Sequence, residues 1–164
     1  MIRLPVALFA ALALAACASV PAAPTYPEAR SYAVSDNAMG DVHAALASAA
    51  MSGKRVLLVM GANWCHDSRA LAGWLESPRI AELVEREYEL VFVNIGMPQT
   101  GDGHNLAIAR SFGLEELPGT PNLLVLTADG TLVNPDTATT WRNAASRSEA
   151  EIFAELERLA GAPV

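Results

Sequence analysis

Residues 55–68 read RVLLVMGANWCHDS and bring an apolar run to a cysteine. The run 55–60 contains β-branched residues and ends at a glycine, a pattern typical of a short strand buried on both faces. After Cys65 the apolar residues follow helical spacing, with Leu71 and Leu75 on one face. A cysteine at the N-terminus of a helix lies near unpaired backbone N–H groups and the positive end of the helix dipole, and both favour the thiolate. The sequence therefore predicts a candidate nucleophile at Cys65.

Two ionisable side chains follow this cysteine and act on it in opposite directions. A protonated His66 would stabilise the thiolate, whereas the negative charge of Asp67 would oppose it. Asp67 also has a purely structural interpretation, because an acid in the first turn of a helix is stabilised by the helix dipole.

The rest of the chain predicts alternating helices and strands that end in a hairpin. Helices are expected from residue 39 to a stop at Gly53, from Ser77-Pro78, and after capping-box signals in 146–151. The remaining patterns predict strands at 55–60, 90–95, 123–127 and 131–134, a short helix at 105–112 and a turn at Asp129-Gly130. This order indicates an α/β domain with a mixed sheet flanked by helices.

Two motifs, in the correct order, resemble the thioredoxin superfamily. Trp64-Cys65 matches the tryptophan and the attacking cysteine of its W-C-x-x-C motif, which lies at such a strand-to-helix junction. Gly119-Thr120-Pro121, just before a predicted strand, matches the segment with the cis-proline that faces the thiol in this family. The resemblance covers residues 39–160 and implies a thioredoxin-like α/β fold, with a mixed four- to five-stranded sheet flanked by helices. It also implies that Trp64 is a partly exposed ring of the site and that the Thr120 backbone aligns a substrate beside Pro121.

Three positions depart from the family pattern. Ser68 stands where the family has its resolving cysteine, so the site is C-x-x-S. In a dithiol enzyme the resolving thiolate attacks the mixed disulfide and closes the catalytic cycle, and serine cannot do this. Val59 replaces a buried acid, and Phe92 replaces the lysine that partners it on the next strand. The chain is therefore not expected to act as an ordinary dithiol reductase.

Three functions remain open for Cys65. The favoured one is monothiol exchange of the reductase, isomerase or deglutathionylation type, in which Ser68 donates a hydrogen bond to the thiolate. Its partners would be protein or low-molecular-weight thiols and disulfides. In the second, the fold is a non-catalytic binding or chaperone-like module and the cysteine is incidental. The third is a soft-metal site of Cys65 and His66, with His104 as a further ligand. It is disfavoured because adjacent Cys and His side chains rarely both reach one ion, and we expect no metal and no cofactor.

The first residues have the composition of a secretory signal. Arg3 precedes an apolar run, 4–16, that is too short to span a bilayer, which needs about 20 residues. Leu14-Ala15-Ala16-Cys17 resembles the lipobox of bacterial lipoproteins, which implies cleavage before Cys17 and lipidation of this residue. An ordinary signal peptide followed by a chance cysteine is the alternative.

On the lipoprotein interpretation the chain has three parts. These are a signal peptide (1–16), a lipid-anchored Pro/Ala-rich tether (17–37) and a thioredoxin-like domain (38–164). The mature chain would then be attached to a membrane of the bacterial cell envelope and face the periplasm. Ala18, in place of an aspartate after the cysteine, favours the outer membrane over the inner one.

Composition sets wider limits. A length of 164 residues suits one domain, and a hydrophobic fraction of 52% excludes wholesale disorder. A net charge of −7 without basic clusters argues against nucleic-acid binding. Two cysteines cannot form a disulfide framework.

Overall fold

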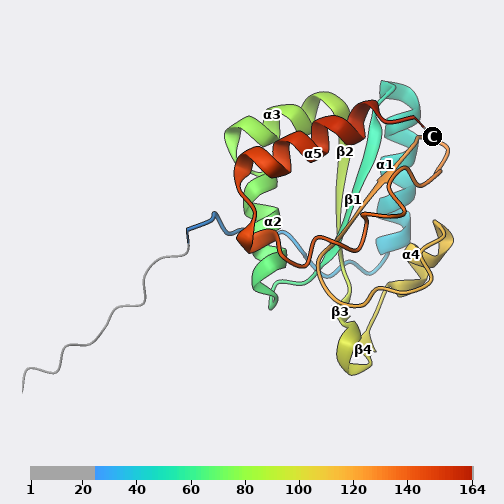
Figure 1. Ribbon diagram of the computed structural model, residues 1–164. Coiled ribbons are helices and arrows are strands. Elements are labelled where there is room, and N and C mark those ends of the chain that lie inside the picture. Colours follow the sequence, from blue (N-terminus) through green and yellow to red (C-terminus); the bar gives the residue numbers. More distant parts are fainter. Residues whose placement is uncertain (1–24, 164) are drawn as a thin grey trace, which may run out of the picture.

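The computed structural model describes residues 25–163, which form a sheet enclosed by helices (Figure 1). The longer helices are α1 (Ala38–Ser52), α2 (His66–Leu75), α3 (Pro78–Glu87), α4 (Leu106–Ser111) and α5 (Glu149–Gly161). The strands are β1 (Arg55–Gly61), β2 (Tyr88–Asn94), β3 (Gly96–Met97), β4 (Asp102–Gly103) and β5 (Asn122–Leu126). Two short 3₁₀ turns, η1 (Pro98–Thr100) and η2 (Ala144–Ser146), complete the described elements.

The main sheet is mixed, with β1 in its centre. β1 pairs in parallel with β2 and antiparallel with β5, in the order β2-β1-β5, while β3 and β4 form a separate small hairpin. The expectation of a mixed sheet flanked by helices is confirmed.

The sheet is nevertheless smaller than the four to five strands expected. In the described residues, the strand predicted at 131–134 is reduced to one bridge between Leu126 and Leu132. The cause is the side chain of Asn134, which accepts the N–H of Val125 and donates to the carbonyl of Leu123. An amide side chain thus takes ladder positions that a longer strand would fill, and Pro135 follows it without an N–H to donate.

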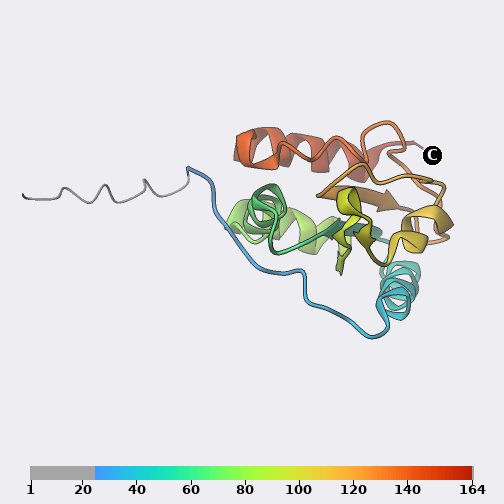
Figure 2. The same cartoon turned by 90° about the horizontal axis from the view of Figure 1, so that it is seen from below.

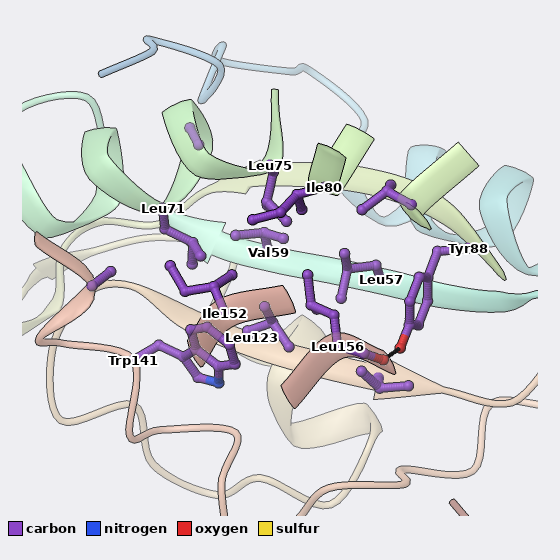
Figure 3. Close-up of a cluster of buried hydrophobic side chains, with 14 of the residues drawn as sticks. Leu57, Val59, Leu71, Leu75, Ile80, Tyr88, Leu123, Trp141, Ile152 and Leu156 are labelled. Carbon is purple, nitrogen blue, oxygen red and sulfur yellow. Dashed lines mark hydrogen bonds between the residues drawn. The ribbon is translucent and has the colours of Figure 1, made fainter. Parts of the chain in front are cut away.

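The two faces of β1 pack into two separate cores. Leu57 and Val59 point to the face covered by α2, α3 and α5 (Figure 3). Val56, Leu58 and Met60 point to the face covered by α1 and α4. The sheet is therefore buried on both sides, which explains why the strand reads as a continuous apolar run instead of an alternating one.

Local signals set the ends of two helices as the sequence predicts. Asn37 caps α1 by accepting the N–H of Gly40, and Gly53 ends this helix in the left-handed conformation, φ 75°. At α5, Ser148 and Glu151 form a capping box in which each side chain binds the other's backbone N–H.

The segment before α1 corrects the expected domain boundary. We call residues 27–35 the strap; they have no helix or strand, and they run along the outside of the domain from α2 to the start of α1 (Figure 2). The strap is not a free tether, because Tyr32 is only 1% exposed and joins the core on the α2 face. The N–H of Ala29 also binds the carbonyl of Arg69 in α2. The folded domain thus begins within the predicted tether.

The predicted signal peptide (1–16) and the lipidation site Cys17 lie outside the described residues. Within the described part of the chain, no helix is both long enough and apolar enough to cross a membrane.

Candidate functional site

Cys65 lies at the junction that the sequence predicts, between β1 and α2. It is the N-cap residue of α2, in an extended conformation (φ −81°, ψ 126°), and its carbonyl accepts the N–H of Arg69. The side chain is 8% exposed and is not in a disulfide within residues 25–163. The thiol is thus held at the positive end of a ten-residue helix, where first-turn N–H groups lack helical partners.

The segment 119–121 faces this thiol. The Thr120–Pro121 peptide bond is cis, and the Cys65 thiol donates to the Thr120 carbonyl at 3.5 Å. The sequence positions are 55 apart, but β5 starts directly after Pro121 and Asn122 pairs with Met60 in β1. The antiparallel pairing of β1 and β5 is therefore what brings the two segments together.

Trp64 extends the site toward the small hairpin. Its ring is 47% exposed, and Nε1 donates to the carbonyl of Gly96 at 2.9 Å. This bond fixes one edge of the ring and leaves an aromatic face in solvent beside the cysteine.

Ser68 is close in the sequence but makes a different contact from the one expected. It is fully buried, and its Oγ accepts the N–H of Ala62 at 3.3 Å. Among the hydrogen bonds of residues 25–163, none joins Ser68 to Cys65, so the expected donation to the sulfur is not seen in this state. Ser68 instead fixes the turn 62–65 that carries the cysteine.

Asp67 has a structural contact that the sequence did not reveal. One carboxylate oxygen accepts the N–H of Ala145 in η2 at 2.8 Å, and the other lies 3.1 Å from Nε2 of His66. The His66 side chain is 64% exposed. Asp67 therefore joins α2 to η2, and His66 is directed to this carboxylate.

His104 has its own hydrogen-bond partner near the small hairpin. Its Nε2 lies 3.1 Å from Oδ1 of Asn94, in the region of the hairpin. The soft-metal interpretation places Cys65 and His66 on one ion, with His104 as a further ligand, but each of these side chains has a different partner in the structure. In residues 25–163 no group of three or more His, Cys, Asp or Glu side chains could hold a metal ion.

Val59 and Phe92, the two replaced positions, are direct partners in the pairing of β1 with β2. Val59 is fully buried, and Phe92 packs against the same core. An apolar pair thus occupies the place where the family resemblance leads us to expect an acid and a lysine.

Three residues that support the site were missed by sequence analysis: Tyr32, Asn63 and Asn94. The Tyr32 N–H donates to Oδ1 of Asn63, and its carbonyl accepts from Nδ2 of Asn63 at 3.0 Å and from Nδ2 of Asn94 at 3.1 Å. The Tyr32 hydroxyl donates to the carbonyl of Ser68 at 3.2 Å. Burial raises the pKa of this hydroxyl above its usual range, and a negative charge on Cys65 raises it further, so it remains a neutral donor. Its sequence signal is weak, because Tyr32 is one of two tyrosines in a Pro/Ala-rich stretch and nothing distinguishes it from Tyr26.

Comparisons with known proteins agree with this geometry. A family model described as thioredoxin-like matches residues 37–128. A solved structure titled as a disulphide isomerase from Xylella fastidiosa Temecula1 is similar, with a TM-score of 0.70 and 29% identity. The match covers 78% of this chain and 95% of that one. No curated protein sequence matches the chain.

A more distant structure shares the fold. It is the C-terminal domain of DsbD from Neisseria meningitidis in the oxidised form, with a TM-score of 0.50 and 17% identity. The match covers 77% of this chain and 97% of that domain.

Proposed function

The chain belongs to the thioredoxin-like family, and we propose that it carries out monothiol thiol–disulfide exchange through Cys65. The observation that carries the proposal is the position of the Cys65 sulfur, at the N-terminus of α2 and 3.5 Å from the Thr120 carbonyl before cis-Pro121. The similar structure from Xylella fastidiosa, titled as a disulphide isomerase, gives independent support.

The first step of the exchange is attack by the Cys65 thiolate on a substrate disulfide. A bond forms between Cys65 and one substrate sulfur, the substrate S–S bond breaks, and the other sulfur leaves as a thiolate. In the second step a thiolate attacks the substrate sulfur of this mixed disulfide, forms a new disulfide and releases Cys65 as a thiolate. When the thiolate that leaves in the first step and the thiolate that attacks in the second belong to the same substrate, no oxidant is needed. The substrate then keeps its number of disulfides and exchanges their pairing, which is isomerisation. For reduction, an external thiolate instead attacks the Cys65 sulfur, and the substrate leaves as a thiolate. A second external thiolate then attacks the sulfur bound to Cys65, so that the external thiol is oxidised to its disulfide and Cys65 leaves as a thiolate.

Residues 25–163 offer no second thiol for the release step. The two cysteines of the chain are Cys17 and Cys65, and Ser68 occupies the resolving position. Release therefore depends on a thiol of the substrate or of another molecule, and an isomerase needs nothing more.

Two neighbours would receive the substrate. The backbone at Thr120, which already accepts a hydrogen bond from the thiol, would align an extended substrate segment beside Pro121. The exposed ring of Trp64 would contact the apolar residues of this segment. Protein disulfides and low-molecular-weight disulfides both remain substrates under this proposal.

Trapping the mixed disulfide tests this function. The full chain is incubated with a protein that carries scrambled disulfides, quenched with acid, and analysed by mass spectrometry without reduction. We expect an adduct on Cys65, recovery of correctly paired substrate, and loss of both in Cys65→Ala, while Cys17→Ser retains both. If wild type forms no adduct and Cys65→Ala binds the substrate as well as wild type, exchange is wrong and the chain is a binding module.

We propose further that Cys17 carries a lipid that anchors the protein in the bacterial cell envelope, facing the periplasm. The lipobox-like residues before Cys17 support this, and Ala18 favours the outer membrane. Several acyl chains together give firm anchoring. Cell fractionation tests it: wild type should sediment with outer membranes, and Cys17→Ser should be released. Equal distribution of the two proteins would contradict the lipid anchor.

A further inference from the structure

Tyr32 is the residue of the strap that hydrogen-bonds directly to the active-site turn, whereas Glu28 reaches the turn through Arg69. The Tyr32 ring is buried against Gly61, the last residue of β1, where a Cβ would lie 2.6 Å from the ring. The glycine therefore leaves the space that the ring occupies. The hydroxyl donates to the Ser68 carbonyl in the first turn of α2. The ring thus contacts both ends of the turn 62–65 that carries Cys65.

The main chain of Tyr32 makes a second set of contacts, with two asparagine side chains. Asn63, inside the turn, both accepts from the Tyr32 N–H and donates to its carbonyl. The Asn63 amide thus binds both main-chain polar groups of Tyr32, as a neighbouring β-strand would. Because Asn63 is two residues from Cys65, the strap fixes the backbone that leads to the nucleophile.

Asn94 connects the same carbonyl to the hairpin on the other side of Trp64. Its Nδ2 donates to Tyr32, while its Oδ1 accepts the N–H of Gly96 at 2.9 Å. Gly96 in turn accepts the bond from Trp64. The strap, the cysteine turn and the hairpin are thus joined in one network of hydrogen bonds.

We propose that Tyr32 is a positioning residue for the Cys65 nucleophile. It holds the turn 62–65 closed, and through Asn94 it holds the hairpin that supports Trp64. The residue does not itself take part in the chemistry, because its hydroxyl donates to a carbonyl and not to the sulfur. The inference rests on the proposed function, which makes Cys65 the reacting group.

The test measures how often the turn opens, and it needs no disulfide substrate. Cys65 is 8% exposed, so a neutral alkylating reagent reacts after local opening of the turn. Alkylation of the full chain by iodoacetamide is followed by mass spectrometry at the peptide that carries Cys65, across a range of pH. If wild type shows no disulfide exchange but the variants below still differ in alkylation rate as expected, the proposed function is wrong and the positioning role of Tyr32 stands.

We expect Tyr32→Ala to alkylate at least about fivefold faster than wild type at every pH, because it removes the ring that packs against Gly61 at the start of the turn. Asn63→Ala should show the same increase, and it leaves the buried ring in place if Tyr32→Ala does not fold. Tyr32→Phe should stay close to wild type, since it keeps the ring and both asparagine contacts. The affected Ser68 carbonyl already has a partner within α2.

Tyr88 supplies the matched control. It is also buried, 2% exposed in the same core, and its hydroxyl donates to the Leu156 carbonyl (Figure 3). It pairs with Arg55 at the opposite end of β1, about 20 Å from the turn at ~3.3 Å per residue. Tyr88→Ala should lower stability without changing the alkylation rate. The proposal is overturned if Asn63→Ala alkylates at the wild-type rate or more slowly, or if Tyr88→Ala accelerates alkylation as much as Tyr32→Ala.

Discussion

The ring of Tyr32 meets the ring of Phe92 edge to face, with centroids 5.2 Å apart and planes at 80°. Phe92 is paired with Val59 in β1, so an aromatic from the strap and an apolar strand pair fill one site beneath the active-site turn. Edge-to-face pairs add about 0.5–1.5 kcal/mol to the effect of burial alone. Val59 and Phe92 therefore contribute to packing, at the two positions where the family resemblance leads us to expect a proton-handling pair. Under the proposed function, exchange at Cys65 would then exchange protons with solvent or substrate thiols and not with this pair.

Buried tyrosines make the folded protein sensitive to alkali. Burial raises the pKa of Tyr32 and Tyr88 above the usual range. An unfolded tyrosine loses its proton near pH ~10, whereas these two keep theirs, so above this pH the unfolded state binds fewer protons. The free energy of unfolding should fall with rising pH by up to about 1.4 kcal/mol per pH unit for each tyrosine. Urea unfolding between about pH 8 and about pH 11 measures it. The fall should be shallower in Tyr88→Phe, and an unchanged slope would assign the loss to other groups.

Much of the fold follows from local signals because the residues that form them are neighbours in the chain. Gly53 ends α1, and Ser148 and Glu151 start α5 without reference to any distant segment. The apolar run of β1 is equally local. Resemblance to a family then placed Thr120 opposite Cys65, a relation that depends on the sheet order and not on either local pattern.

The supports of the site could not be predicted because they join segments far apart in the sequence. Tyr32 is 31 positions from Asn63 and 62 from Asn94, and nothing periodic marks its stretch of chain. The strand predicted at 131–134 forms only one bridge, and the reason is related. Asn134 reaches across to β5 and replaces ladder hydrogen bonds, whereas the Asp129-Gly130 turn before this segment predicts the second strand of a hairpin.

A resolving thiol should change how mixed disulfides leave Cys65. Ser68→Cys puts a second thiol three residues along the first turn of α2, a separation that disulfides can span. We expect the lifetime of the Cys65 adduct to fall by about tenfold or more, because release becomes intramolecular. The product should be an internal disulfide, detected as a mass lower by two hydrogens. Ser52→Cys, at the end of α1, adds a thiol away from the site and should leave the lifetime unchanged. An equally long-lived adduct in Ser68→Cys would show that the buried position prevents attack.

The capping box of α5 should stabilise the fold at neutral pH and lose this effect in acid. Ser148→Ala removes the acceptor of the Glu151 N–H and should cost about 1 kcal/mol. Hydrogen bonds from the Ser148 backbone and hydroxyl lower the pKa of Glu151. A lowered folded-state pKa adds stability that is present above the unfolded value, about 4.3, and is lost as pH falls through the folded value. Glu151→Ala should thus differ from wild type at about pH 7 and approach it at about pH 2 in urea unfolding. A constant difference would mean that the carboxylate charge plays no part.

Asp67 should stabilise the fold by joining α2 to η2. This stabilisation should depend on the carboxylate oxygen as an acceptor more than on the negative charge. The Ala145 N–H in η2 is partly buried and donates to Asp67 at 2.8 Å, so Asp67→Ala leaves it unpaired. We expect a loss of about 1–3 kcal/mol in the free energy of unfolding and faster hydrogen exchange at the Ala145 amide. Asp67→Asn keeps an oxygen in the same place, and its loss should be smaller. If the asparagine variant loses as much stability as the alanine variant, the negative charge on the acceptor, and not the oxygen alone, is what holds the Ala145 N–H.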